Sequence, residues 1–505
     1  MSNDKINNYE DNKNKNEDKN KDKNNENSNN EKINNNEINI NEIDSPKEKE
    51  DKNDNIAIVM GDPKRAIRKL SWPIMVSMLV TFAYNLADTI WVAGLGTNSL
   101  AALGFFMPIF LIIIGLGNGI GAGTNSLIAR AIGAKNKKKA DNAAMHGIII
   151  TIVISIIAPI ILIFFLNDIL LLMGAGSVAP LTSEYATVIL IGLITLLLPS
   201  VGASILRSEG DVNRAMHVMI ITAVLNIVLD PIFIYVLNLG LRGAAYATLL
   251  SSLISVIIIF YWLLIKKDTY LNVSMEDFSW SPKIVKEIIS IAIPSTSETI
   301  TISIVSLVIN FLLSVTTGPM GVAVYTAGWR IVNLAMIPHI GLGTATLTVI
   351  GAAYGGRKFK KLITGYDYSI KLGLGISIAS GIIIFIFAPQ ISMIFSYADT
   401  NLTSAISDFL RILCIFCIAL PLGIVSSSTF QGLGKGFIAL FLTIQRALLF
   451  EVIFMYVFAF TLNMGTSGVW WGLSLGGLVG YLISYIITKL YLREIDKVYI
   501  KSENS

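Results

Sequence analysis

Beyond residue 60, the chain alternates between long apolar runs and short polar connections. Twelve of these runs are long enough to cross a bilayer as helices, because spanning takes about 20 predominantly apolar residues. The expected spans have the approximate boundaries 71–95, 100–129, 144–166, 185–206, 216–238, 242–265, 288–314, 321–350, 367–395, 406–430, 437–462 and 468–492. The pattern therefore predicts an all-α membrane protein with 12 transmembrane helices.

Lysine and arginine gather in alternate connections between these spans. Such residues precede the first span, follow every even-numbered span and occur after the last, as at Lys64, Arg68, Arg130, Lys137, Arg207, Arg214, Lys266, Lys283, Lys358, Lys361, Lys435 and Lys489. Cytoplasmic loops carry the excess of basic residues. We therefore expect a multi-pass protein of the cell membrane with both termini in the cytoplasm.

The polar ends and the middle of the chain complete the expected domain organisation. Residues 1–55 are dominated by Asn, Lys, Glu and Asp, and such a composition buries too little apolar surface to fold. They are expected to form a disordered cytoplasmic tail; its acids offset its bases, so a nucleic-acid partner is not expected. The remaining divisions are an N-lobe (60–265), a cytoplasmic linker (266–286), a C-lobe (287–492) and a short cytoplasmic C-terminal tail (493–505).

The two halves of the apolar region repeat each other. A Gly-rich stretch beginning at Gly119 recurs at Gly341 with the same spacing of glycines, threonine and downstream basic residues, at an offset of 222. At nearly that offset Pro73 pairs with Pro294, Pro199 with Pro421 and Asp230 with Glu451. Six helices per half keep both halves in the same orientation, as in parallel-repeat transporters. We expect two pseudo-symmetric six-helix lobes around a central cleft.

An acid inside the fifth span is the first candidate for chemistry. Asp230 is costly at membrane depth, so it should face a bundle interior or a water-filled cavity. Asn226 lies four residues earlier and therefore on the same helix face. Pro231 cannot donate to the carbonyl of Ile227, which leaves an acceptor free near the acid. A structural kink with a helix-helix hydrogen bond is the alternative interpretation.

Two other spans place polar groups at a similar depth. At 1.5 Å per residue, Asp88 in the first span and Asp230 both lie about 10–12 Å below the outer surface, and Thr248 in the sixth lies about 10 Å below it. Two nearby carboxylates raise one another's affinity for a proton or cation, and oxygen ligands suit a hard cation. We therefore predict one Na⁺ or H⁺ site formed by Asp88, Asn226, Asp230 and Thr248, with no other cofactor.

The combination of these features resembles the multidrug and toxic compound extrusion (MATE) family, with a closer match to its prokaryotic DinF-like subgroup. The resemblance rests on the duplicated 12-span pattern, the Gly-rich second span, the segment Tyr84-Asn85-Xaa-Xaa-Asp88-Xaa-Xaa-Trp91 after Pro73, and Asn226-Xaa-Xaa-Xaa-Asp230-Pro231. It covers about residues 60–492. It implies a V-shaped pair of lobes, a first helix that bends at Pro73, and Tyr84 and Tyr185 lining the N-lobe cavity; cavity packing or a bilayer-interface position is the alternative for both tyrosines.

Two further acids lie in spans of the C-lobe. Glu298 follows Pro294 by four residues in the seventh span, and Glu451 lies in the eleventh, where Ala447 stands in place of an asparagine four residues before it. Each is a possible C-lobe site, either as a contact for a cationic substrate or as a second proton site. Otherwise each finds a polar neighbour in the bundle, and Arg446 is one candidate for Glu451.

The expected function is Na⁺- or H⁺-coupled antiport of organic compounds by alternating access, without enzymatic activity. The expected substrates are small amphipathic organic molecules, cationic ones among them, carried across the lipid bilayer by a monomer. A flippase for lipids or lipid-linked precursors is the alternative within the transporter class. A membrane-embedded transferase is a more distant one, because the three histidines are scattered and no long catalytic loop is present.

Overall fold

The computed structural model describes residues 54–266, 268–396 and 399–503, and the regular elements among them are all helical. The predicted disordered tail, residues 1–55, lies outside the described residues except for its last two positions. Eleven helices are long and apolar enough to cross a membrane, and a pair bent by 51° forms the twelfth span. The predicted 12-helix architecture is therefore confirmed.

The spans follow the chain in order, and each coincides with one expected apolar run. They are α2 (Pro63–Ala93), α3 (Thr97–Gly133), α4 (Lys137–Phe164), the bent pair α6 (Ala179–Ile191) and α7 (Leu193–Ser208), α8 (Val212–Pro231) with η2 (Ile232–Val236), α9 (Gly240–Phe260) with η3 (Tyr261–Lys266), α10 (Pro282–Thr316), α11 (Pro319–Gly355), α12 (Phe359–Ser396), α13 (Thr400–Gly432), the run α14 (Gly436–Ile444), η4 (Gln445–Glu451), α15 (Val452–Tyr456) and η5 (Val457–Thr461), and α16 (Gly465–Glu503). A short helix, α5 (Leu166–Leu172), joins α4 to the bent pair.

The helices extend into the polar segments that the sequence sets apart. Helix α10 begins at Pro282, inside the expected linker 266–286, and α16 runs to Glu503 through most of the expected tail 493–505. The residues after 492 are mainly good helix formers without Gly or Pro, so the helix continues past the apolar stretch. The non-helical part of the linker lies alongside the start of α4. There Asp141 accepts a hydrogen bond from the Asn272 amide, and His146 Nε2 accepts one from the Ser281 amide.

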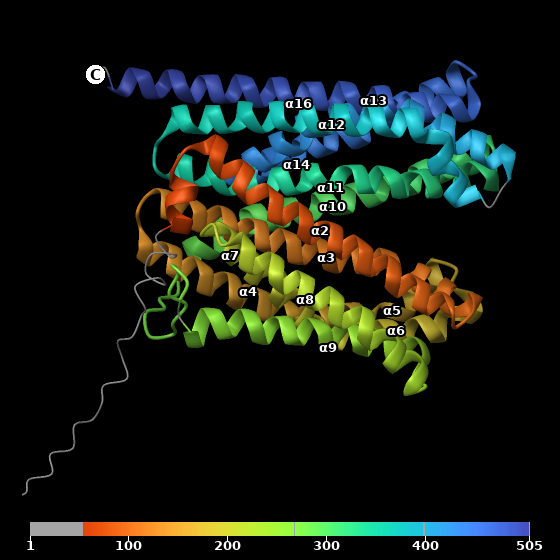
Figure 1. Cartoon of the computed structure of the whole chain (residues 1–505), viewed down its shortest axis with the longest axis horizontal. Helices are drawn as coiled ribbons and strands as arrows, with labels where there is room; N and C mark the ends of the chain where they lie inside the picture. The colour runs from red at the N-terminus through yellow and green to blue at the C-terminus, as the bar shows by residue number, and fades with distance from the viewer. Residues whose placement is uncertain (1–53, 267, 397–398, 504–505) are drawn as a thin grey trace, which may run out of the picture. The chain divides into compact units, whose positions relative to one another are not determined.

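We call α2–α9 the N-lobe and α10–α16 the C-lobe, and Figure 1 shows them as two groups of near-parallel helices, orange to green and green to blue. Helix α3 packs along α10, and α11 packs along α2 and α3. We call the end of the spans that carries Arg130, Arg214 and Lys361 the basic end. The lobes are in contact there: the Ser126 hydroxyl donates to the Gln431 carbonyl (2.6 Å), and Lys139 pairs with Glu287 (3.1 Å).

The close approach of α3 and α11 at the basic end needs two glycines. A Cβ at Gly133 would lie 1.9 Å from the Ala352 carbonyl oxygen, and a Cβ at Gly355 would lie 1.9 Å from the Arg130 carbonyl oxygen. Both glycines and both partners are related by the offset of 222 that the sequence repeat shows. The internal repeat therefore builds a two-fold contact, which we call the glycine clasp.

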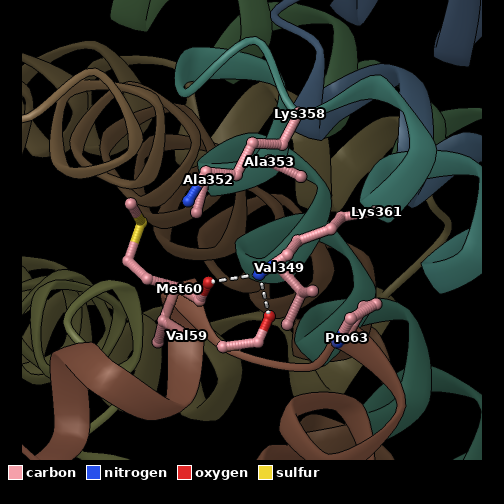
Figure 2. A pocket seen from close by; sticks show the side chains of 9 residues that line it. Val59, Met60, Pro63, Val349, Ala352, Ala353, Lys358 and Lys361 are labelled. Carbon is pink, nitrogen blue, oxygen red and sulfur yellow. Dashed lines mark hydrogen bonds between the residues drawn. The ribbon is translucent and has the colours of Figure 1, made fainter.

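The short helical segment before α2, residues 54–60, connects the two lobes at the same end. Val59 is buried, and Asn55 and Val59 lie against Gly210 of the N-lobe. On the other side, the Lys361 ammonium of the C-lobe donates to the Met60 and Gly61 carbonyl oxygens at 3.0 and 2.7 Å (Figure 2). Residues 54–61 thus contact both lobes at once.

The repeat does not keep one offset along the whole chain. Near the basic end, Lys135 and Arg357 share a positive φ of 56° and 55°, an offset of 222. After η2 and η5, Asn238 and Asn463 share a positive φ of 52° and 53°, an offset of 225. The pairing of Asp230 with Glu451, drawn from an offset near 222, is therefore wrong: in this part of the fold the offset of 225 pairs Asn226 with Glu451.

Candidate functional site: a carboxylate pair in the N-lobe

Three helices of the N-lobe supply the four predicted site residues. Helix α2 carries Asp88 five residues before its end, α8 carries Asn226 and Asp230, and α9 carries Thr248. Helix α8 packs against both α2 and α9, so it is the central helix of the site. Asp230 and Asn226 are completely or almost completely buried. The structure thus places the four residues at one junction of three helices.

One amide group connects two of these helices. Asn226 Nδ2 donates to Asp230 Oδ1 and to Thr248 Oγ1, each at 3.3 Å. An amide nitrogen carries only two hydrogens, so both are used inside the site. The Asn226 carbonyl oxygen is left as an acceptor, and its orientation is fixed by the two donated bonds.

Three buried oxygens at the site have no hydrogen-bond partner: Asp88 Oδ1, Asn226 Oδ1 and Asp230 Oδ2. They make up a third of the nine such side-chain atoms among the described residues, so the deficit is concentrated here. All three are acceptors, and a buried acceptor without a donor costs about 1–3 kcal/mol, more when it is charged. A proton or a cation would supply the missing partners.

The two carboxylates are close enough for their charges to interact, and the hydroxyls of Tyr84 and Tyr185 lie within electrostatic range of both. Tyr185 is buried and packs edge-on against Phe106, with 5.0 Å between the ring centroids. Among the residues that the structure describes, no Lys or Arg forms an ion pair with Asp88 or Asp230. The structure brings both tyrosines to the N-lobe site.

Tyr235 also belongs to this neighbourhood, and the sequence analysis missed it. Its hydroxyl donates to the Trp91 carbonyl oxygen at 2.5 Å, and a Cβ at Gly94 would lie 2.2 Å from that hydroxyl. Tyr235 therefore holds the end of α2, one turn beyond Asp88, against η2. The available signal was the glycine three residues after Trp91, which leaves room for a large neighbour.

Pro73 lies far from these residues. It is buried inside α2, which runs without a break from Pro63 to Ala93, and it precedes Asp88 by four turns of helix. Pro73 lacks an amide hydrogen, so the turn that contains it has one hydrogen bond fewer than the rest of the helix.

The two C-lobe acids have a different environment. Glu298 accepts from Gln431 Nε2 (3.0 Å) on one oxygen and from Ser427 Oγ (2.8 Å) and Thr443 Oγ1 (3.2 Å) on the other. Glu451 forms an ion pair with Arg446, as the sequence suggested. The structure does not bring either acid together with Asp88 and Asp230, and among the described residues neither has a fully buried oxygen without a hydrogen-bond partner.

The donors around Glu298 come from α13 and α14, more than a hundred residues further along the chain. Ser427 and Gln431 lie four apart on one face of α13, and Thr443 faces them from α14. Nothing in the sequence connects these three residues to Glu298 in particular. They could be found only from the packing of α10 against α14 and of α13 against α14.

Comparisons with known proteins agree with this arrangement. The sequence model of the MatE family matches residues 73–232 and 294–457, one segment in each lobe. The FAD transporter of Shewanella oneidensis is 27% identical over 370 residues, which cover 72% of this chain and 80% of that protein. The multidrug export protein MepA of Staphylococcus aureus is 25% identical over 432 residues, covering 84% of this chain and 94% of MepA.

Solved structures give the same result at higher identity. A MOP superfamily transporter from Pyrococcus furiosus is 42% identical, with a TM-score of 0.85 over 88% of this chain and 98% of that one. A MATE structure in the straight conformation is 41% identical, with a TM-score of 0.85 over 88% of this chain and 99% of that one. Taken with the 12 spans and the duplicated lobes, these matches show that the chain belongs to the MATE family of membrane transporters.

Proposed function

We propose that this protein exports small amphipathic organic molecules, cationic ones among them, in exchange for Na⁺ or H⁺ bound at Asp88, Asn226, Asp230 and Thr248. The single observation that carries the proposal is the group of three unpartnered oxygens on Asp88, Asn226 and Asp230. Such a site is stable only when a cation or proton enters it, so its occupancy can be linked to a change of conformation. Export of multiple drugs by MepA supports the substrate class.

The basic end is the cytoplasmic one in this proposal, because cytoplasmic loops carry the excess of Lys and Arg. The lobes meet there through the glycine clasp and through pairs such as Lys139 with Glu287. A transporter closed at its cytoplasmic end is ready to release substrate outward and to take up the coupling ion. Bending of α2 at Pro73, where one backbone hydrogen bond is missing, would move Asp88 relative to α8.

The donor set fits either coupling ion. A single proton shared by Asp88 and Asp230 would remove the repulsion between their charges. A sodium ion would use the carboxylate oxygens, the Asn226 carbonyl oxygen and the Thr248 hydroxyl, which are ligands that hard cations prefer. In both cases Asn226 positions Asp230 through its amide.

The test is substrate efflux from proteoliposomes under an imposed gradient of pH or of Na⁺. Asp88→Asn and Asp230→Asn should each abolish gradient-driven efflux, while Asp168→Asn, at an exposed acid of the N-lobe, should leave it unchanged. Ethidium and a flavin nucleotide, tested in parallel, report whether the substrates are cations or anions, and a labelled lipid tests the flippase alternative. Normal coupling in both N-lobe variants would contradict the proposed site.

A further inference from the structure

The C-lobe contains a structural copy of the N-lobe cation site, and the register of that copy follows from equivalent contacts. A Cβ at Gly243 would lie 2.5 Å from the Phe233 carbonyl oxygen, and a Cβ at Gly468 would lie 2.5–2.6 Å from Phe458 backbone atoms. Both members of each contact are related by 225 residues, as are Gly240 and Gly465, which share a φ of 56°. An offset of 225 therefore relates the outer parts of α8 and α9 to α15 and α16.

In this copy two of the four polar ligands are replaced by apolar residues. Met455 takes the place of Asp230, and Leu473 takes the place of Thr248; both are fully buried. Glu451 takes the place of Asn226 and is equally buried. Asn310 of α10 takes the place of Asp88, at the offset of 222 that relates Gly96 to Gly318. The C-lobe copy thus consists of two apolar side chains, one amide and one carboxylate.

Arg446 lies next to that carboxylate. Before η4 the offset is 224, as between Gly210 and Gly434, which both have a positive φ, so Arg446 takes the place of Thr222, which is polar but uncharged. In the N-lobe the hydroxyls of Thr222 and Ser255 are hydrogen-bonded to each other. The equivalent of Ser255 is Gly480, where a Cβ would lie 2.7–2.8 Å from Arg446 carbon atoms. Gly480 leaves the space that the longer side chain occupies, and the π-helical turn η4 (Gln445–Glu451) supplies the extra residue that brings Arg446 and Glu451 together.

The Arg446 guanidinium is surrounded by groups that favour its charge. It forms the ion pair with Glu451, interacts electrostatically with Glu298, and lies over the Tyr481 ring at 4.7 Å from the centroid. Tyr325 and Tyr481 are the other titratable groups that face Glu451. Glu298 has hydrogen-bond donors on both oxygens, and one oxygen of Glu451 accepts from Arg446, so each acid of the C-lobe has a partner within the chain.

We propose that Arg446 is a fixed internal cation that occupies the C-lobe copy of the cation site and confines ion exchange to the N-lobe. In the N-lobe a mobile Na⁺ or H⁺ compensates the buried carboxylates, whereas in the C-lobe the compensating charge is part of the chain. Arg446 therefore determines how many ions the transporter exchanges per cycle. The inference rests on the proposed N-lobe coupling site.

The experiment measures ion binding directly in purified protein, with ²²Na⁺ and with proton release at a pH electrode as the two probes. The wild-type protein should bind the ion, and Asp230→Asn should not. In the Asp230→Asn background, Arg446→Gln should restore ion binding by exposing Glu451, and adding Glu451→Gln should remove it again. Arg446→Lys keeps the charge and should restore nothing.

The outcomes separate this inference from the proposed function. Ion binding that persists in Asp230→Asn contradicts the N-lobe site itself. If Asp230→Asn loses binding and the folded Asp230→Asn, Arg446→Gln protein does not regain it, the fixed-cation assignment is wrong. Should Arg446→Gln fail to fold, Glu451→Gln alone decides, because it must keep wild-type ion binding and loss of binding would overturn the assignment.

Discussion

At the scale of single residues, the N-lobe and C-lobe acids differ in what compensates them. Asp88 and Asp230 have unpartnered oxygens, whereas Glu298 and Glu451 have their donors built into the chain. A buried carboxylate is costly unless it is paired or protonated. The first prediction therefore tests the N-lobe pair.

The first prediction concerns non-additivity within the site. Asp88→Asn and Asp230→Asn should each abolish coupled efflux, and the double variant should be no worse, because a site that has lost one acid cannot complete the cycle. Asn226→Ala and Thr248→Ala should weaken coupling more mildly, since a hydrogen bond to a charged group contributes about 1.5–3 kcal/mol. Efflux rates in proteoliposomes measure all five variants, and two single losses that add up would argue for separate sites.

The second prediction concerns Glu209, in the connection between α7 and α8. Its carboxylate accepts from the Leu271 amide at 3.0 Å, and burial raises the pKa of Glu209 from 4.5 to about 8. A raised pKa means that the docked linker is favoured when Glu209 is protonated, so its docking is strongest below about pH 4.5 and weakens as the pH rises through about 8.

Hydrogen exchange of the amides of residues 268–274, corrected for the intrinsic rate, measures this docking. Protection should fall between about pH 6 and pH 9 in the wild-type protein, and Glu209→Gln should remove that dependence. Glu276→Gln, at an exposed acid of the same linker, is the matched control. An unchanged pH profile in Glu209→Gln would assign the dependence to another group.

At the scale of helices, the clasp of α3 and α11 is built from two glycines at equivalent repeat positions. Gly133→Ala or Gly355→Ala would place a methyl group 1.9 Å from a carbonyl oxygen, so the helices must separate. We expect the basic end to open and efflux to slow in both variants. Gly104→Ala in the same α3 is the control, because a Cβ there meets nothing within 4 Å.

Spin labels at the exposed positions Lys138 and Lys360 test this directly. Double electron–electron resonance spectroscopy should show a longer distance between the two labels in either clasp variant than in the wild-type protein or in Gly104→Ala. An unchanged distance would mean that other contacts between the lobes determine closure of the basic end.

The helical segment before α2 leads to a prediction about truncation of the N-terminus. Deleting residues 1–53 should leave insertion and transport largely intact, because that composition cannot pack against the bundle. Deleting residues 1–60 removes Val59, which is buried between the lobes, and the Met60 carbonyl that accepts from Lys361, so we expect a lower melting temperature and slower efflux. Equal melting temperatures of the two truncated proteins in a thermal-shift assay would show that this segment contributes nothing to stability.

At the scale of the whole molecule, the alternating basic loops predict the orientation in the membrane. Tags at either terminus, and labels near Lys137 or Lys358, should all report the cytoplasmic side. Accessibility of these labels in sealed cells and in inverted vesicles is the measurement. A terminus on the outside would contradict the expected topology, although the 12 spans themselves would remain.

The sequence alone determined the 12 spans, because crossing a bilayer requires about 20 apolar residues and leaves a pattern that each segment carries by itself. It also indicated that Asp88, Asp230 and Thr248 share one depth, since the rise of a helix converts position along the chain into distance. Only the tertiary structure decided which acids are compensated. The donors to Glu298 come from other helices, and one extra residue in η4 raises the repeat offset from 224, as between Gly210 and Gly434, to 225, so that Glu451 matches Asn226. A one-residue π-helical insertion changes no apolar run, so hydropathy cannot reveal it.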